Sequence, residues 1–411
     1  MKSVKSNFIY TLINTIAGLL FPLISFPYVS RILLADGIGL VSFYSTIISY
    51  VVLLTNLGIP IYGIKAIAHV RDNIIETVKT AKEILYLNLT FSIIGYLIVL
   101  ILSLSVNELQ ENIPVFILLS SSIILNAIGV PWFFSGIEDF KYVTIRGILV
   151  RLVSLIFLFI FVRTKQDIIY YAGYEIFASV GNNVVNFFMF RKHISKQTVG
   201  FKDLNFVRHL KPIFNTFIFN LITSIYLKLD ITILGFLSHT ENVGFYTAAS
   251  RIAHIFLSLT LALGQATLPR LSSHIGRNDY ESFKLLANKS LNFILFISLP
   301  LCGGVIVLAP NLVMLLCGDS FGPSIVTVRI LSFILISIGL SNLFGLQMLY
   351  PQGKINIVNI SVAVGATLNL VLNLILIPKY AQNGAAIATI IAESSVTITQ
   401  LIIGKKLVRI V

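Results

Sequence analysis

The chain has 411 residues, of which 56% are hydrophobic and 11% charged, with a mean hydropathy of +0.91. So few charged side chains could not cover a soluble domain, which excludes a water-soluble enzyme or binding protein. The formal net charge is +13, but the basic residues are dispersed among apolar runs, which argues against a nucleic-acid-binding face.

The N-terminal segment is expected to be a retained first helix. Lys2 and Lys5 precede an apolar stretch from Phe8 to about Leu34. This stretch is longer than the 7–15-residue core of a signal peptide and lacks a small-x-small cleavage site. Pro22 and Pro27 remove backbone hydrogen bonds inside it, so we expect a bend there.

Long apolar runs recur along the rest of the chain with only short polar interruptions. A helix needs about 20 such residues to cross ~30 Å of hydrocarbon, so the pattern predicts an all-α polytopic membrane protein with about twelve transmembrane helices. The predicted helices are 8–34, 40–62, 84–106, 113–135, 146–163, 167–190, 213–236, 244–268, 288–309, 322–345, 357–377 and 385–404.

The positively charged residues indicate the orientation of these helices. With a cytoplasmic N-terminus, the inner connections and both termini carry about 22 Lys and Arg, and the outer connections about 4. Lys and Arg accumulate on the cytoplasmic side of membrane proteins, so we expect both termini in the cytoplasm. The inner segments are Lys2–Lys5, Lys65–Lys82, Lys141–Arg146, Arg191–Lys211, Arg270–Lys289, Lys354 and Lys405–Arg409.

The most polar long connection divides the chain into two halves. It predicts a six-helix lobe over 1–190, a cytoplasmic connection over 191–212 and a second six-helix lobe over 213–411. A short repeated string supports the division, because Ile38-Gly39 near the start of the second helix resembles Val243-Gly244 at the start of the eighth. Internal repeats are common in secondary transporters, although one short match is also compatible with coincidence.

Charged residues inside the predicted helices are the first candidates for a functional site. Each costs at least ~2.5–3.5 kcal/mol to insert at the centre of a helix, and such residues usually mark substrate or ion pathways. The basic ones outnumber the acidic ones. They are Arg151, Lys228, Arg251 and Arg329, against Glu175, Asp230 and Glu393.

The cations are placed where an anion could be bound. Arg251 and Arg329 each lie about seven residues inside a predicted helix that starts at the outer face, roughly 10 Å below that face. Arg31 ends the first helix on the same side, and Lys228 lies in the outer half. With Arg151, they form a candidate site for a diphosphate group. Alternatively, Arg251 pairs with Asp230, while Lys228 and Arg151 extend to an interface.

The acidic residues are candidates for ion coupling. Glu175 and Glu393 each lie about eight residues into the last helix of a lobe, so either one, or Asp230, could bind a proton or a sodium ion. A buried carboxyl neutralised by Arg or kept protonated is the alternative. Cys302 and Cys317 show no disulfide framework, and no His/Cys spacing indicates a metal site or a cofactor.

Specific strings accompany the hydropathy pattern along nearly the whole chain. Their order and spacing carry more information than any one of them. They are Pro22-Leu-Ile-Ser-Phe-Pro-Tyr-Val-Ser-Arg31, Gly37-Ile-Gly39, Leu57-Gly-Ile-Pro-Ile-Tyr-Gly63, Trp132-Phe-Phe-Ser-Gly-Ile-Glu138, Leu227-Lys-Leu-Asp230 with Gly235, Val243-Gly-Phe-Tyr246 before Arg251, and Gly384-Ala-Ala-Ile-Ala-Thr389 before Glu393.

These strings resemble those of Wzx-type O-antigen and polysaccharide flippases. The resemblance implies the fold of the multidrug/oligosaccharidyl-lipid/polysaccharide exporter superfamily, with two six-helix lobes around a central cavity and alternating access. It implies an undecaprenyl-diphosphate-linked oligosaccharide as substrate in a bacterial inner membrane, and Arg31 and Arg251 as cavity-facing residues. Lys65 departs from the more usual Arg and lacks its bidentate geometry, which weakens a phosphate-contact role there.

Two other functions are alternatives to a flippase. A multidrug exporter of the same superfamily would share the layout, but its usual cargo is cationic, and several cavity cations would repel it. A membrane polysaccharide polymerase or glycosyltransferase would need a sizeable extramembrane loop, whereas the longest outer connections have about a dozen residues. The sequence therefore favours a flippase. Its expected partners are membrane lipids and other polysaccharide assembly proteins.

The predicted topology can be tested by cysteine accessibility. We expect a cysteine placed at position 200 to be protected in intact cells from a membrane-impermeant thiol reagent, and to react after the cells are opened. Labelling of intact cells would show that the connection over 191–212 lies outside.

Overall fold

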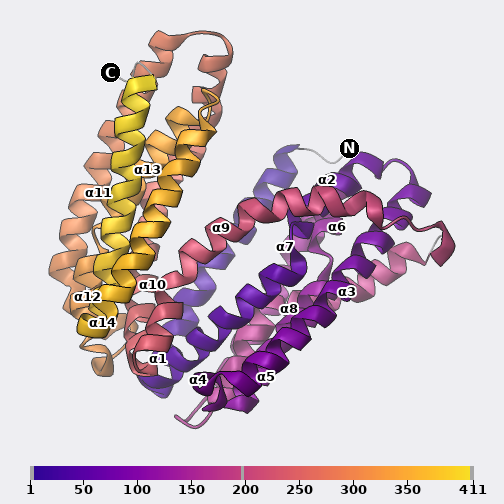
Figure 1. The fold of residues 1–411 in the computed structure, drawn as a ribbon, viewed down its shortest axis with the longest axis horizontal. Coiled ribbons are helices and arrows are strands. Elements are labelled where there is room, and N and C mark those ends of the chain that lie inside the picture. Colours follow the sequence, from indigo (N-terminus) through magenta and orange to yellow (C-terminus); the bar gives the residue numbers. More distant parts are fainter. Residues whose placement is uncertain (1–3, 196–198, 408–411) are drawn as a thin grey trace. The chain divides into compact units, whose positions relative to one another are not determined.

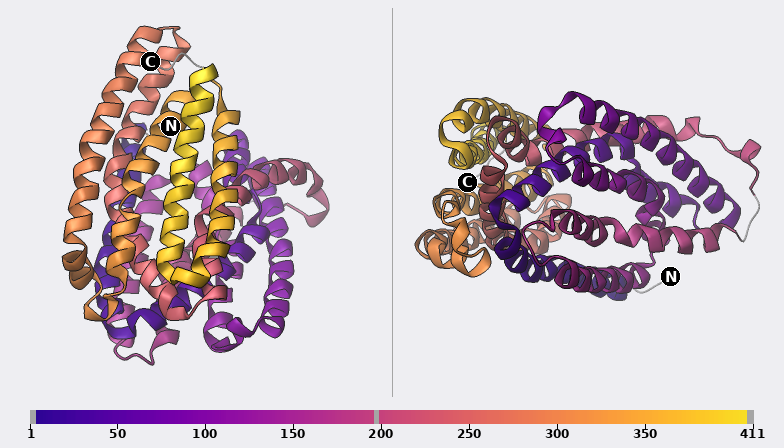
Figure 2. Two further views of the ribbon diagram at one scale, coloured as in Figure 1. Left: turned by 60° about the vertical axis from the view of Figure 1, so that its left-hand side comes forward. Right: turned by 90° about the horizontal axis from the view of Figure 1, so that it is seen from below.

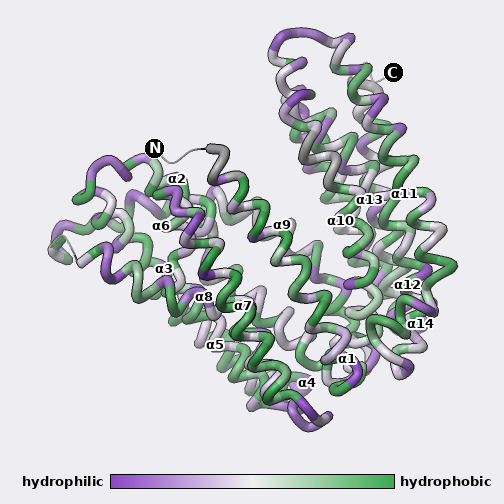
Figure 3. The backbone as a smooth tube through the Cα atoms, turned by 180° about the vertical axis from the view of Figure 1, so that it is seen from behind, coloured by the Kyte–Doolittle hydropathy of each residue, from purple (hydrophilic) through white to green (hydrophobic). Residues whose placement is uncertain are grey.

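The computed structural model describes residues 4–195 and 199–407, and these contain helices and turns but no β-strand. Seven helical stretches of the described residues are long and apolar enough to cross a membrane. Figure 3 shows hydrophobic residues along the helices and hydrophilic ones gathered at many of the connecting turns. The predicted all-α polytopic membrane fold is confirmed. Lys2, Arg409 and residues 196–198, which entered the topology prediction, lie outside the described residues.

The described residues of the first half, 4–195, form the helices α1 to α8 (Figure 1). They are α1 (Val4–Asn56), α2 (Ile59–Val70), α3 (Ile74–Ser105), α4 (Asn107–Gln110), α5 (Ile113–Gly129), α6 (Pro131–Gly136), α7 (Phe140–Phe161) and α8 (Ile168–Ile194).

The second half is helical as well and includes one π-helical segment, η3. Its elements are η1 (Phe201–Asp203), α9 (Val207–Leu237), α10 (Thr240–Gly276), α11 (Tyr280–Leu316), η2 (Asp319–Phe321), α12 (Ser324–Leu331), α13 (Ile334–Ser341), η3 (Asn342–Leu349) and α14 (Ile355–Leu407).

The two longest helices each contain a break. α1 breaks at Leu34, with φ 59°, and α14 at Ala381, with φ 46°. These left-handed φ values interrupt the helical hydrogen bonding between predicted spans 8–34 and 40–62, and between 357–377 and 385–404. Pro22 and Pro27 keep helical backbone angles. The count of twelve spans stays a prediction, because α8, α9 and α10 are not among the seven apolar stretches.

The chain folds as two compact units. Unit 1 comprises Met1–Leu33 and Val41–Lys228, and unit 2 comprises Leu34–Leu40 and Leu229–Val411. The division passes through α9, after the connection over 191–212. The lobes over 1–190 and 213–411 and the cytoplasmic connection over 191–212 stay predictions.

In unit 1, α3, α5, α8 and α7 are neighbours in that order (Figure 1). α2 packs against α6, and close approach between them requires glycine. An added Cβ on Gly63 would lie 2.7 Å from the Trp132 ring, and one on Gly136 would lie 2.7 Å from Cβ of Ile67. Two of the strings that carried the family resemblance therefore form one helix–helix contact.

In unit 2, α10 packs against α11, α12, α13 and α14. Figure 2 shows the long helices of this unit running side by side. The segment Leu34–Leu40 belongs to this unit. An added Cβ on Gly39 would lie 1.7 Å from the carbonyl oxygen of Thr240, and one on Gly244 would lie 1.9 Å from that of Ala35. Gly39 and Gly244, the glycines of the repeated strings, thus make a direct backbone contact, which supplies a physical reason for the repeat.

This contact predicts that alanine is not tolerated at either glycine. We expect Gly39→Ala and Gly244→Ala to lower the stability of the purified protein by ~1–3 kcal/mol or more, because backbone atoms must move. The measurement is thermal unfolding in detergent.

Gly303→Ala is the matched control, since no atom lies within 4 Å of its added Cβ. It should be neutral or slightly stabilising, because alanine loses less conformational entropy than glycine in a helix. Equal unfolding temperatures in all three variants would contradict the close contact.

Candidate functional site

A buried carboxylate in unit 2, that of Asp230, accepts hydrogen bonds from four side chains. Asp230 of α9 is 8% exposed. Its Oδ1 accepts hydrogen bonds from Nδ2 of Asn369 at 2.9 Å and of Asn373 at 2.7 Å. Its Oδ2 accepts from the hydroxyls of Tyr246 at 2.6 Å and Thr389 at 2.8 Å. Four neutral donors therefore surround one carboxylate, and we call these five residues the Asp230 cage.

The helices of unit 2 explain how the cage forms. Asn369 and Asn373 are four residues apart on α14, so they share a helix face, while Thr389 follows the break at Ala381. α10 supplies Tyr246. The cage thus joins both halves of α14 to α9 and α10, and sequence spacing alone could not have assembled it.

The cage has the chemistry of a proton or cation site. The buried Oδ1 of Asn373 has no hydrogen-bond partner among the described residues. Amide orientation is assigned from the hydrogen-bond network, and turning the two amides would direct their oxygens toward Asp230. Carboxylate, amide and hydroxyl oxygens are suitable ligands for a hard cation. Among the described residues, no group of three or more His, Cys, Asp or Glu side chains could hold a metal ion.

The alternative prediction was an ion pair between Arg251 and Asp230. In the structure, other residues donate hydrogen bonds to the Asp230 carboxylate. None of its four donors is Arg251. Arg251 is half-buried on α10, which begins at Thr240. Eleven residues of helix place it roughly 16 Å along the axis, farther from the helix start than the sequence indicated.

The remaining site candidates of unit 2 are Arg329 and Glu393. Arg329 is exposed, and its Nε donates to the carbonyl oxygen of Ile306 on α11 at 3.2 Å. Glu393 is half-buried on α14.

Unit 1 holds the other four candidates. Nη1 of Arg151 donates to Oδ1 of Asn14 at 3.0 Å, which fixes this half-buried guanidinium between α7 and α1. Lys228 lines a pocket of about 320 Å³ with residues of α1, including Tyr50 and Asn56. The sequence therefore identified two cations that the fold holds inside unit 1.

Arg31 and Glu175 are also placed in unit 1. Arg31 is exposed, and its Nη1 donates to the carbonyl oxygen of Pro27 at 2.6 Å. Glu175 of α8 is half-buried and accepts a 2.7 Å hydrogen bond from the hydroxyl of Tyr171, one helical turn earlier. Substrate-binding and ion-coupling roles for all eight residues stay predictions.

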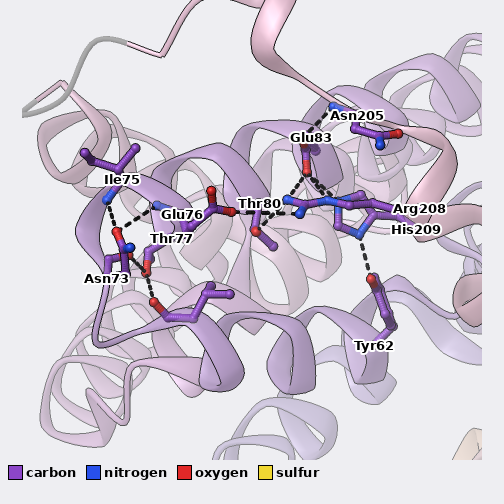
Figure 4. A network of polar contacts seen from close by, with 11 residues as sticks. Tyr62, Asn73, Ile75, Glu76, Thr77, Thr80, Glu83, Asn205, Arg208 and His209 are labelled. Atoms are coloured by element: carbon purple, nitrogen blue, oxygen red, sulfur yellow. Dashed lines mark hydrogen bonds and ion pairs between the residues drawn. The ribbon is translucent and has the colours of Figure 1, made fainter.

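A second buried carboxylate was missed by the sequence analysis. Glu83 of α3 is 0% exposed and accepts hydrogen bonds from Nη2 of Arg208 and Nε2 of His209, both at 2.6 Å (Figure 4). The backbone N–H of Asn205 also donates to it at 2.6 Å. The hydroxyl of Tyr62 lies 2.6 Å from Nδ1 of His209. This Glu83 network ties the inter-lobe connection to α2 and α3.

The network was missed because its members were spread along the chain. Glu83 stood one residue before a predicted span, and Arg208 counted only as a charge of the inner connection. His209, which lies before the predicted span at 213, is buried, and burial lowers its pKa while the Glu83 carboxylate opposes that shift. The neutral imidazole can bridge Glu83 and Tyr62 through its two nitrogens.

We expect Glu83→Ala to lower the stability of the purified protein by about 3 kcal/mol, because Arg208 and His209 lose their buried partner. Thermal unfolding measures this. Glu76→Ala is the control, since Glu76 is 42% exposed and lies 3.8 Å from Arg208; it should cost at most about 1 kcal/mol. Similar losses in the two variants would refute a dominant role for Glu83.

Solved structures identify the class of fold. The lipid II flippase MurJ in an inward closed conformation has a TM-score of 0.73 and 19% identity, covering 97% of this chain and 87% of MurJ. An inward-facing multidrug resistance MATE family transporter of the MOP superfamily also has a TM-score of 0.73, at 14% identity and 98% coverage of both chains. The fold of this chain therefore resembles the folds of these two transporters.

The family is identified by sequence. The polysaccharide biosynthesis protein family matches residues 4–274, and the chain belongs to it. The MatE family matches residues 216–375. A protein of Escherichia coli (strain K12) named "Putative O-antigen transporter" is 28% identical over 404 residues, which cover 96% of this chain and 95% of that protein. The predicted family resemblance is confirmed.

Proposed function

We propose that the chain is a flippase that moves undecaprenyl-diphosphate-linked oligosaccharide repeat units across the bacterial inner membrane by alternating access. The product would serve O-antigen or capsular polysaccharide assembly. The observation that carries this proposal is the similarity to the Escherichia coli protein over 96% of the chain. In this proposal the chain is a transporter and not an enzyme, and both termini are cytoplasmic.

The charges of the spans support an anionic substrate. A diphosphate needs cationic partners in a low-dielectric cavity, and guanidinium groups bind phosphate oxygens bidentately. Arg151 and Lys228 are held within unit 1, where Asn14 orients Arg151 and Lys228 lines a pocket. We assign substrate contacts to these two residues together with Arg31, Arg251 and Arg329.

A multidrug exporter is the alternative, supported by the MatE match over residues 216–375. The cations favour the flippase, because a cationic drug would meet like charges. The two functions are separable in cells, since one restores surface polysaccharide and the other confers drug resistance.

The Asp230 cage suggests how transport is coupled to an ion. Its ligands come from α9, α10 and both halves of α14. Binding of a proton or sodium ion would change the charge at the point where these helices meet. An ion shifts a conformational equilibrium only if the two conformations bind it with different affinity. The ligands of the cage come from three helices, so movement of one helix would change its affinity for the ion. Glu175 and Glu393 are further candidates.

Complementation of a flippase-null strain, scored by surface polysaccharide, tests the proposed function. We expect the wild-type chain to restore polysaccharide and Arg251→Ala to abolish or severely reduce it at near-normal membrane levels. Arg251→Lys should retain part of the activity, because charge survives while bidentate geometry does not. Failure of the wild-type chain, with drug resistance gained instead, would favour the exporter. Full transport by Arg251→Ala combined with Asp230→Ala would remove Arg251 from the substrate site.

Ion binding at the cage is tested on the purified protein. We expect sodium chloride, compared with choline chloride, to raise the unfolding temperature, and Asp230→Asn to abolish this dependence. An ion at a hundredfold excess over its Kd stabilises by about 2.7 kcal/mol.

The exposed Asp319 supplies the control for this experiment, and Asp319→Asn should behave as wild type. Loss of the dependence in Glu175→Gln or Glu393→Gln, but not in Asp230→Asn, would move the coupling site to those residues.

A further inference from the structure

Arg146 on α7 is buried without a partner for two of its nitrogens. The residue is 9% exposed, and no acceptor among the described residues bonds its Nε or Nη1. A guanidinium carries five N–H donors and stays charged in proteins. A buried charge without hydrogen bonds is costly, so this arrangement is suited to an anionic ligand.

The Arg146 guanidinium is held in one place by an aromatic ring. Its Cζ lies 5.1 Å from the ring centroid of Tyr142, which in turn packs 4.7 Å from the ring of Phe134. The cation–π contact offsets part of the burial cost but satisfies no N–H group. The hydroxyl of Tyr142 is itself buried, and no described residue forms a hydrogen bond with it.

Both side chains line one pocket of about 510 Å³ between α7 and α8. Its walls include Ile145, Leu149 and Val185, which are 46%, 56% and 40% exposed on the outer surface of the unit. The charged lining residues besides Arg146 are Asp139 and Lys141, so the three together carry one net positive charge. The pocket combines a cationic, donor-rich part with an apolar wall that continues onto exposed hydrophobic surface.

We propose that this pocket binds a phosphorylated lipid. The phosphate accepts hydrogen bonds from Nε and Nη1 of Arg146 and from the hydroxyl of Tyr142, and the hydrocarbon chain lies along Ile145, Leu149 and Val185. A neutral lipid leaves the guanidinium unsatisfied, and free phosphate makes no use of the apolar wall.

The depth of Arg146 agrees with this ligand. α7 begins at Phe140, so Arg146 lies roughly 9 Å along the helix axis from its first residue. Lipid phosphates occupy the interfacial layer outside the ~30 Å hydrocarbon core, and a site near a helix end can reach them. The phosphate can come from a polyprenyl carrier, which would make the pocket a loading site, or from a resident anionic phospholipid. The inference does not require that the chain be a flippase.

Native mass spectrometry of the full chain in detergent tests the site. The probes are undecaprenyl phosphate, phosphatidylglycerol and inorganic phosphate, applied to the wild type, Arg146→Met, Arg146→Lys and Tyr142→Phe. Hydrogen bonds to a charged group predict a loss of lipid affinity of roughly tenfold to a hundredfold in Arg146→Met, with smaller losses in Arg146→Lys and Tyr142→Phe. Preference for one lipid over the other identifies the source of the phosphate, and either preference supports the site.

Arg191→Met is the matched control, because Arg191 is an exposed arginine on α8 that also lies over an aromatic ring, that of Phe187 at 6.0 Å. It should bind lipid as the wild type does. Without lipid, Arg146→Met should unfold at the same or a higher temperature than the wild type, because an unpaired buried charge is removed.

Two results would overturn the inference: unchanged lipid affinity in Arg146→Met, or inorganic phosphate bound as tightly as either lipid. Neither result would alter the complementation outcome, so failure of this site and failure of the proposed flippase function are distinguishable.

Discussion

Inside a bilayer no water is available to a polar group, so the chain itself must satisfy its backbone and its charges. This constraint accounts for the uniformly helical structure of the described residues, because a helix bonds its own N–H and C=O groups. It also confines irregular backbone to a few places, such as Leu34 in α1 and Ala381 in α14. The Ala381 break lies between cage residues Asn373 and Thr389, so the interruption of α14 and the Asp230 cage are parts of one arrangement.

Three buried charges meet the same constraint in three ways. Asp230 accepts from neutral amides and hydroxyls, and Glu83 accepts from Arg208, His209 and a backbone N–H. Arg146 instead has two nitrogens that no described residue satisfies. A carboxylate paired with an arginine is suited to holding segments together. A carboxylate among neutral donors can exchange them for an ion, and an unsatisfied guanidinium is suited to an anionic ligand.

Close packing of glycine explains why short strings of this sequence were informative. Gly39 meets Thr240 and Gly244 meets Ala35 within unit 2, while Gly63 lies against Trp132 in unit 1. Each of these glycines lacks room for a Cβ atom, so the string around it is restricted by a partner far away in the chain. The family resemblance therefore rested largely on helix–helix contacts, and only partly on charged residues.

The sequence by itself determined the helical membrane fold and the family, because hydrophobic run length and short sequence strings are local properties of a chain. Tertiary structure decided which charges have which partners. In the sequence, Asn369, Asn373 and Thr389 do not differ from other polar helix residues, and only packing places them beside Asp230. Arg146 was counted as a cytoplasmic charge, and only the structure shows that it is buried away from water. The Asp230 cage and the Glu83 network join residues more than a hundred positions apart, and a hydropathy pattern carries no record of which distant helix faces meet.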